Sequence, residues 1–353
     1  MESETNTAPI WVLLGKWHGD NQQLLAIAEA MQLPYRTIQL RFNRASRLPP
    51  ALLGASRLSW NSEVPLAPPW PRLVLAAGRR SVPAARWIRC KSAGSTRLVH
   101  VNRPWAPLSW FDLIISTPQY ALPERPNVVS NLMPFLPPPS DRSPAASLPS
   151  DAAAMPRPWT AVLVGGNSQP HVLSDAIAAS LANAVNEHVR KAGGSAWVLD
   201  SPRTPATAMG VIEKGLEVPS HIVHWREGKK VYSALLGLAD RFIVTEDSAS
   251  MMTEALLSGR PVTLFKLESR PKWRRRFASA WRVAAERDPS SMTARCFEVA
   301  VDLGLLTAVR DLRLLHRALE KADMFGGAGQ PVERAERERH ATLARIAALI
   351  KAP

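Results

Sequence analysis

The chain has 353 residues, is 46% hydrophobic and carries a formal net charge of +14. A chain of this length exceeds the size at which single cores stop growing, so two domains are expected. No apolar run approaches the roughly 18 residues of a spanning helix, and the acidic start at residues 1–9 lacks the pattern of a signal peptide. These features predict a cytoplasmic protein, either soluble or peripheral at a membrane. The positive charge predicts attraction to phosphorylated ligands, anionic lipid surfaces or nucleic acid.

The first half of the chain alternates short apolar runs with helical patterns. Strands are predicted at residues 10–14, 36–42, 73–76, 97–101, 113–116 and 128–132, with helices at 21–31 and 82–91. The proline-rich stretch 48–69 receives no assignment. Residues 136–158 are rich in proline, serine and alanine, which is typical of a semi-extended linker between domains. Only Cys90 and Cys296 are present, far apart in sequence, so a disulfide framework is not expected.

The second half repeats the alternation. Strands are predicted at 161–164, 196–199, 221–224, 242–245 and 262–265, with a long helix at 172–191 and a charged helical tail from 307 onward. Strands that alternate with helices imply parallel pairing and right-handed crossovers. We therefore expect an α/β fold of two doubly wound Rossmann-like domains, 1–135 and 159–306, with residues 307–353 packing across them. Ligands of such sheets bind beyond the carboxyl ends of the strands, so the cleft between the domains is the predicted site.

The loop after the first strand holds candidates for proton transfer. His18 has a suitable unperturbed pKa, whereas Asp20 would need a raised one. The structural alternatives are that Asp20 caps a helix and that His18 has no role. Lys16 in the same loop, with Arg79 and Arg80 at a later strand end, could contact an anionic acceptor or form plain surface charge.

Two further loops follow predicted strands. Gly165 and Gly166 permit close approach of the backbone to a phosphate, and Asn167 and Ser168 add hydrogen-bonding groups. The other loop opens a helix between the strands 242–245 and 262–265, which Asp247 or Ser248 can cap. Such a helix start presents free N–H groups and a positive dipole end to an anion, although an ordinary βαβ crossover has the same pattern.

A basic and aromatic segment lies at 270–282. It places Lys272, Arg274, Arg275 and Arg276 among Trp273, Phe277 and Trp281. This mixture suits a helix lying on anionic headgroups, and it also suits single-stranded nucleic acid or a solvated helix face. Neither an Asp-x-Asp motif nor a His or Cys cluster with ligand spacing occurs in the sequence, so we expect no metal and no cofactor.

Glu254, Gly259 and Pro261 form the pattern E-x4-G-x-P, which resembles the donor-binding helix of GT-B glycosyltransferases. The resemblance implies that Glu254 holds the ribose of a nucleotide sugar, that the helix entrance faces the diphosphate and that no metal is needed. The residues then expected to bind the donor are Gly165, Gly166, Asn167, Ser168, Arg203, Thr204, Thr245, Asp247, Ser248, Ala249, Ser250 and Glu254.

Longer segments resemble a narrower group, the bacterial mitochondrial-fission-protein family. They are GDNQQLLAIAEAM, AGRRSVPAARWIR, FDLIISTPQY, LVGGNS and VTEDSASMMTEALLSGRPV, and the likeness covers most of residues 11–267. The chain departs from the family pattern at Pro202 and at 230–232, which leaves the contacts of Arg203 and Tyr232 open. The family takes its name from a plant protein that acts at the mitochondrial surface, and it has also been labelled a nucleotide-sugar epimerase.

These resemblances imply a metal-independent transfer of sugar from a nucleotide-sugar donor to an acceptor at or near the cytoplasmic membrane face. The expected partners are a nucleotide sugar and an anionic membrane surface or lipid-linked acceptor, and nucleic acid is not expected. Two alternatives stay open, a nucleotide-sugar epimerase and a non-catalytic membrane-associated scaffold. Only an epimerase would invert a sugar centre without a second substrate.

Overall fold

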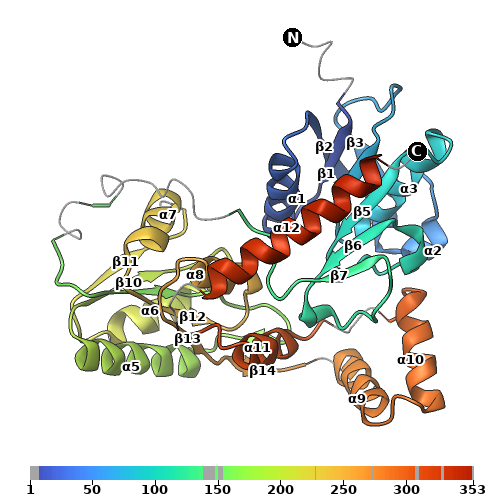
Figure 1. Ribbon diagram of the computed structural model, residues 1–353. Coiled ribbons are helices and arrows are strands. Elements are labelled where there is room, and N and C mark those ends of the chain that lie inside the picture. The colour runs from blue at the N-terminus through green and yellow to red at the C-terminus, as the bar shows by residue number, and fades with distance from the viewer. Residues whose placement is uncertain are drawn as a thin grey trace. The chain divides into compact units, whose positions relative to one another are not determined.

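The computed structural model describes residues 8–137, 148–149, 154–226, 228–271, 273–306, 310–326 and 330–351 (Figure 1). Most of the predicted linker 136–158 lies outside these residues. The chain divides into two compact units. Unit 1 comprises Met1–Leu136, Arg274–Leu315 and Glu336–Pro353, and unit 2 comprises Pro137–Trp273 and His316–Ala335. Residues 274–306, which the sequence analysis assigned to the second domain, thus cluster with the first.

The described part of unit 1 forms a seven-stranded sheet in the order β3-β2-β1-β4-β5-β6-β7. Every pair is parallel except β2 with β3. This is the expected doubly wound arrangement, and each predicted strand is present. The strands are β1 (Ile10–Leu14), β2 (Tyr35–Phe42), β3 (Trp60–Ser62), β4 (Leu73–Ala77), β5 (Arg97–Val101), β6 (Leu113–Ser116) and β7 (Val128–Ser130).

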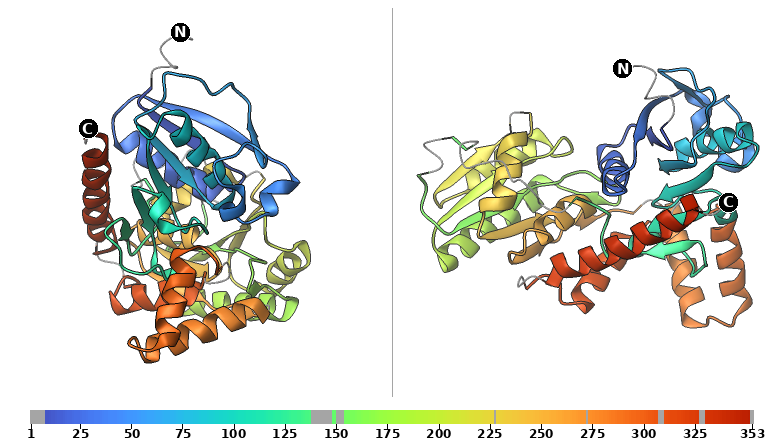
Figure 2. Two further views of the ribbon diagram at one scale, coloured as in Figure 1. Left: turned by 90° about the vertical axis from the view of Figure 1, so that its right-hand side faces the viewer. Right: turned by 45° about the horizontal axis from the view of Figure 1, so that its top comes forward.

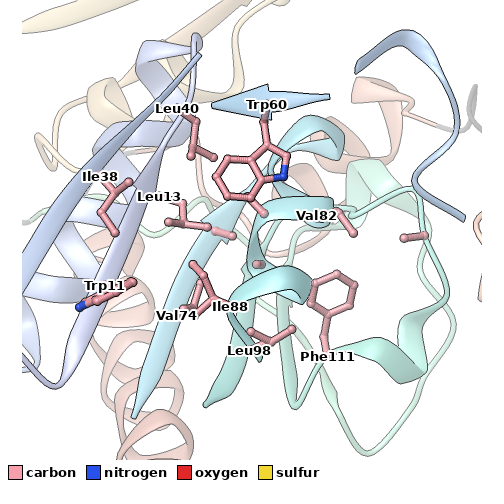
Figure 3. Close-up of a cluster of buried hydrophobic side chains, with 14 of the residues drawn as sticks. Trp11, Leu13, Ile38, Leu40, Trp60, Val74, Val82, Ile88, Leu98 and Phe111 are labelled. Carbon is pink, nitrogen blue, oxygen red and sulfur yellow. The ribbon is translucent and has the colours of Figure 1, made fainter. Parts of the chain in front are cut away.

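Helices cover both faces of this sheet. Alternate residues of the strands, including Trp11, Leu13 and Val74, pack against Ile88 of α3 (Val82–Lys91), as Figure 3 shows. The other face packs against α1 (His18–Ala30) and against Ile346 of α12 (Gln330–Lys351). A sheet buried on both faces explains why its strands read as continuous apolar runs in the sequence.

The unassigned stretch 48–69 contains two short elements. Pro50 begins the helix α2 (Pro50–Leu53), a position where proline costs no intrahelical hydrogen bond. The strand β3 pairs antiparallel with β2, and its Trp60 is buried. That pairing joins residues that are distant in sequence, so local composition alone did not reveal it.

Unit 1 also contains two neighbouring helices, α9 (Trp273–Arg287) and α10 (Met292–Asp302). They lie side by side in all three ribbon views (Figure 2). Ala278 and Ala285 of α9 pack with Phe297 and Val301 of α10. The two helices thus share a small hydrophobic cluster.

The described part of unit 2 forms a five-stranded parallel sheet in the order β11-β10-β8-β12-β13. Its strands are β8 (Trp159–Leu163), β10 (Ser195–Leu199), β11 (Ser220–Val223), β12 (Arg241–Thr245) and β13 (Val262–Phe265). Its helices are α5 (Asp175–Ala192), α6 (Ala206–Gly215), α7 (Lys229–Leu238) and α8 (Ala249–Leu256), and α11 (Leu312–Lys321) straddles the unit boundary. The second predicted doubly wound sheet is thus present.

The long helix of unit 2 begins later than the sequence pattern suggested. Residues His171–Val172 form the strand β9, which pairs with β14 (Glu268–Ser269). Ser174 then caps α5, accepting a hydrogen bond from the Ile177 amide. The apolar spacing from 172 onward matched a helix, but the pairing with a distant strand and the serine cap set the start at Asp175.

Candidate functional site

Each sheet has a point where the crossovers change direction, between β1 and β4 in unit 1 and between β8 and β12 in unit 2. Doubly wound sheets bind their ligands at such points. An aspartate lies at each one. Asp20 is beside Gly78, which follows β4, and Asp247 is beside Gly165, which follows β8. The two aspartates differ in what they contact.

The carboxylate of Asp247 is buried and hydrogen-bonded to other residues of the chain. Its side chain is 0% exposed. One carboxylate oxygen accepts hydrogen bonds from the Gly166 amide at 3.1 Å and from Arg203 at 2.9 Å, and the other accepts from the Thr245 hydroxyl at 2.8 Å. Because a buried carboxylate needs such partners, Asp247 acts as an internal anchor of the loop.

The two glycines of this loop have a structural role. A Cβ at Gly165 would lie 2.0 Å from an Asp247 oxygen, and a Cβ at Gly166 would lie 2.1 Å from the Arg203 carbonyl oxygen. The Gly165 amide donates to the Thr245 hydroxyl at 2.7 Å. Their N–H groups thus serve Thr245 and Asp247. We expected these amides to bind a phosphate. In the structure the glycines instead make room for a carboxylate of the chain itself.

Other predicted donor residues surround the same loop. Thr204 accepts from the Ser201 amide at 2.9 Å, while Asn167 accepts from the Leu173 amide at 3.0 Å. Ser168 forms an isolated bridge with His171. Arg203 is the predicted cation that still reaches solvent, since its side chain is 42% exposed.

Helix α8 starts as expected at the carboxyl edge of β12. Ser248, not Asp247, caps it by accepting from the Met251 amide at 3.5 Å. Ala249 is buried and Ser250 is half-buried in the first turn. The first-turn N–H groups of an α-helix have no acceptor within the helix, so this end suits an anion.

Glu254 lies further along α8 and is half-buried. Its carboxylate accepts a short hydrogen bond from the Tyr232 hydroxyl. Burial raises the pKa of Glu254, and the hydrogen bond from Tyr232 opposes that shift. Tyr232, whose contacts the sequence left open, thus positions Glu254 from α7.

Asp20 lies inside the first turn of α1, whose N-cap residue is Trp17. Asn102, which follows β5, donates to Asp20 Oδ1 at 2.9 Å. The position of a Cβ on Gly78 would be 3.6 Å from Asp20 Oδ2. Burial raises the pKa of Asp20, while Arg310 and the Asn102 amide lower it. The predicted alternative of a simple helix cap is therefore wrong.

The other predicted residues of unit 1 are less constrained. His18 is exposed at the start of α1, and Lys16 is exposed beside the Trp17 ring, at 5.9 Å. Arg79 donates to the Ser46 carbonyl at 3.4 Å, and Arg80 is exposed. Asp20, by contrast, is held by a hydrogen bond from Asn102, which makes it the best-positioned titratable group of the loop.

A polar group surrounds Asp20, and the sequence analysis did not single out its Arg310. Arg310 donates to Gln119 Oε1 at 3.0 Å, and Gln119 donates to the Thr117 hydroxyl at 3.0 Å. Burial raises the pKa of Tyr120 to about 12, with Arg310 and Asp20 as the nearby charges. Gln119 and Tyr120 follow the predicted strand 113–116, so their place at the ligand edge could be expected from the sequence, whereas nothing local marked Arg310.

A second missed group lies at the carboxyl edge of unit 2. Asp200 follows β10 and His224 follows β11, and their side chains meet at 2.8 Å. Asp200 also accepts from the Trp225 amide at 2.6 Å. Across the described ranges, no three His, Cys, Asp or Glu side chains group as a metal site would.

His100 is buried two residues before Asn102. Its burial should make the stability of the protein depend on pH. Burial lowers the pKa of His100 to about 4. Because the unfolded state takes up a proton near pH 6.5, stability should be full at pH 7 and fall by about 2 kcal/mol toward pH 5. Urea unfolding of wild type and His100→Gln checks this. The slope attributable to His100 should vanish in the variant, and parallel curves for the two proteins would contradict it.

The arginines of the basic helix α9 do not all face solvent. Lys272 lies outside the described residues. Arg274 and Arg276 are exposed, but Arg275 donates to the Arg310 carbonyl at 2.9 Å. The prediction that Arg275 faces a membrane is wrong, since helical spacing points its side chain toward unit 1. No helix in the described ranges combines the length and apolarity needed to cross a bilayer.

Comparison with known proteins identifies the family. The model of the mitochondrial fission ELM1 family matches residues 18–284. The chain belongs to this family. An uncharacterized Rickettsia prowazekii protein is 24% identical over 295 residues, covering 72% of this chain and 82% of that protein. The Arabidopsis thaliana mitochondrial fission protein ELM1 is 26% identical over 218 residues, 54% of this chain and 51% of that protein. The family resemblance drawn from the sequence is thus confirmed.

Solved structures similar to this ELM1-family chain include three with nearly full coverage. Acinetobacter baumannii MurG is 12% identical, with a TM-score of 0.40 over 94% of this chain and 99% of that one. The spinosyn forosaminyltransferase SpnP is 12% identical, with a TM-score of 0.48 over 98% and 100%. A Neisseria meningitidis UDP-GlcNAc 2-epimerase bound to UDP-GlcNAc is 10% identical, with a TM-score of 0.44 over 95% and 99%.

Proposed function

We propose that the protein is a metal-independent glycosyltransferase that uses a nucleotide sugar and acts at the cytoplasmic face of a membrane. The observation that carries the proposal is the placement of Glu254. Glu254 lies in the second turn of α8, the helix that follows β12 at the switch point of unit 2, and Tyr232 of α7 donates to its carboxylate. A carboxylate fixed in this way can accept hydrogen bonds from the hydroxyls of a ribose.

The diphosphate of the donor would lie at the start of α8. The N–H groups there and the exposed guanidinium of Arg203 supply positive charge where negative charge grows on the leaving group. Gly165, Gly166 and Asp247 would act indirectly by fixing Arg203 and the loop. This assignment keeps Ser248, Ser250 and Arg203 as donor contacts.

Unit 1 would supply the base. In the reaction the bond between the anomeric carbon and the diphosphate oxygen breaks, and the acceptor oxygen bonds to that carbon. The proton of the acceptor hydroxyl passes to the Asp20 carboxylate, and the electron pair leaves with the nucleoside diphosphate. Burial raises the pKa of Asp20 toward the value that a base needs near neutral pH.

The membrane part of the proposal rests on α9, α10 and the residues that directly follow α10. Large apolar side chains exposed there include Trp273 at 71%, Met292 at 71% and Leu305 at 67%. Phe277, Val299 and Leu303 are exposed as well, and Arg274 and Arg276 lie among them on α9. Apolar side chains flanked by arginines fit an anionic lipid surface, where the rings enter the interface and the cations meet phosphates.

Removing the two exposed arginines should weaken binding to anionic vesicles. Each contributes about 1 kcal/mol near an anionic surface, so the double variant Arg274→Ala/Arg276→Ala should bind about 30-fold more weakly. The measurement is flotation with vesicles containing phosphatidylglycerol. The matched control removes exposed Arg44 and Arg47 of the same unit, and it should bind like wild type. Equal binding of both double variants would contradict the membrane assignment.

Product analysis tests the transfer itself. The protein is incubated with a panel of nucleotide sugars, with and without a membrane lipid extract as the acceptor source. The proposal expects nucleoside diphosphate release that depends on the extract, with sugar recovered in the lipid fraction. An inverted sugar centre without any extract would establish the epimerase instead, and no reaction together with no nucleotide binding would favour the scaffold.

A further inference from the structure

Asn102 occupies a constrained position directly after β5. Its backbone φ is 65°, in the left-handed region that asparagine tolerates better than most residues. Its backbone N–H donates to the Ile115 carbonyl of β6 at 2.7 Å. Its side-chain nitrogen donates to Asp20 Oδ1 at 2.9 Å, across 82 residues of sequence. The backbone and side-chain hydrogen bonds together fix the direction of the Asn102 side-chain amide.

His100 supports this turn from the core. One ring nitrogen, Nδ1, lies 3.0 Å from the Asn102 carbonyl oxygen, and Nε2 lies 3.4 Å from the Gly78 carbonyl oxygen. The ring is 0% exposed and packs against Phe111 with centroids 5.0 Å apart. His100 therefore links the segments after β4 and β5, the two that face Asp20.

We propose that Asn102 is a positioning residue for proton transfer by Asp20. Its amide occupies Oδ1 and so assigns the transfer to Oδ2, the oxygen beside Gly78. Gly78 has a φ of 72° and no side chain, so no Cβ occupies the point 3.6 Å from that oxygen, where a hydroxyl could approach. The inference rests on the proposed function, because it gives Asp20 the role of the base.

If Asn102 only supported the fold, replacing it would leave the pKa of Asp20 unchanged. The amide donates to the ionised carboxylate, so its removal should raise the pKa of Asp20. Asn102→Gly suits this test because glycine adopts a φ of 65° without strain. Asn102→Asp is the second variant. It keeps the side-chain shape but places a like charge beside Asp20, which should raise the pKa further.

The experiment combines ¹³C NMR titration of aspartate-labelled protein, with Asp20 assigned by Asp20→Asn, and a pH profile of transfer. Both Asn102 variants should titrate Asp20 at higher pH. Asn102→Gly should lower kcat at least tenfold with KM nearly unchanged, and Asn102→Asp should move the acidic limb of the profile to higher pH. Asn127→Ala is the control, since Asn127 donates to the Leu108 and Phe111 carbonyls and not to Asp20.

An active wild type whose Asn102 variants keep the same Asp20 titration and the same kcat would overturn the inference alone. A wild type that transfers no sugar from any nucleotide sugar would remove the proposed function, and the positioning role with it. The two failures are thus distinguishable.

Discussion

Replacing Asp20 by Asn should reduce sugar transfer by a factor of about 100 to 10,000, the usual contribution of a positioned general base. The amide cannot accept the proton of the acceptor hydroxyl, yet it keeps the size of the carboxylate beside Asn102 and Gly78. The loss should appear in kcat. Nucleotide affinity should be unchanged, because the proposed donor contacts belong to unit 2.

Initial rates and nucleotide titrations of Asp20→Asn provide this measurement. Glu29→Gln is the matched control, since it makes the same acid-to-amide change at an exposed position of α1. It should transfer sugar at the wild-type rate. If Asp20→Asn were as active as Glu29→Gln, the base would have to be another group, and exposed His18 would be the next to test.

Replacing Asp247 by Ala should lower the free energy of unfolding by about 2–6 kcal/mol, because it leaves two buried hydrogen-bond donors unsatisfied at about 1–3 kcal/mol each. The change leaves the Gly166 amide and the Thr245 hydroxyl without their acceptor and releases Arg203. Asp247 is therefore expected to matter far more for the stability of unit 2 than a residue that only touches a ligand.

Urea unfolding followed by tryptophan fluorescence measures the effect. Asp175→Ala removes the same charge from an exposed position in the first turn of α5 and should cost well under 1 kcal/mol. A variant Asp247→Ala that unfolds at the same urea concentration as Asp175→Ala would mean that the buried network contributes nothing to stability.

The fold was largely predictable because both sheets are covered on two faces. Apolar runs such as 10–14 and 242–245 can then only be buried strands, and all predicted strands are present. The short strands β3 and β9 were not predictable. Each depends on a partner strand far away in sequence, and their lengths are too small for a period to show.

The candidate site was only partly predictable. Placing ligands after the carboxyl ends of strands singled out the loops of Asp20 and Asp247, and each loop lies at the switch point of its sheet. The same rule, applied after strand 97–101, would have found Asn102. The rule did not reveal that the Asp247 side chain packs against Gly165, since that contact joins residues 82 positions apart. A glycine pair has the same appearance in sequence whether it makes room for a phosphate or for a carboxylate of the chain itself.

Nucleotide binding by a Glu254→Ala variant tests the central claim most directly. Calorimetric titration with a panel of nucleoside diphosphates should show saturable binding to wild type and about 10- to 100-fold weaker binding to the variant, because hydrogen bonds to a charged acceptor contribute about 1.5–3 kcal/mol. Glu213→Ala, at an exposed position on α6 of the same unit, should bind like wild type. Equal affinity of all three proteins, or no binding of any nucleotide to wild type, would contradict the account.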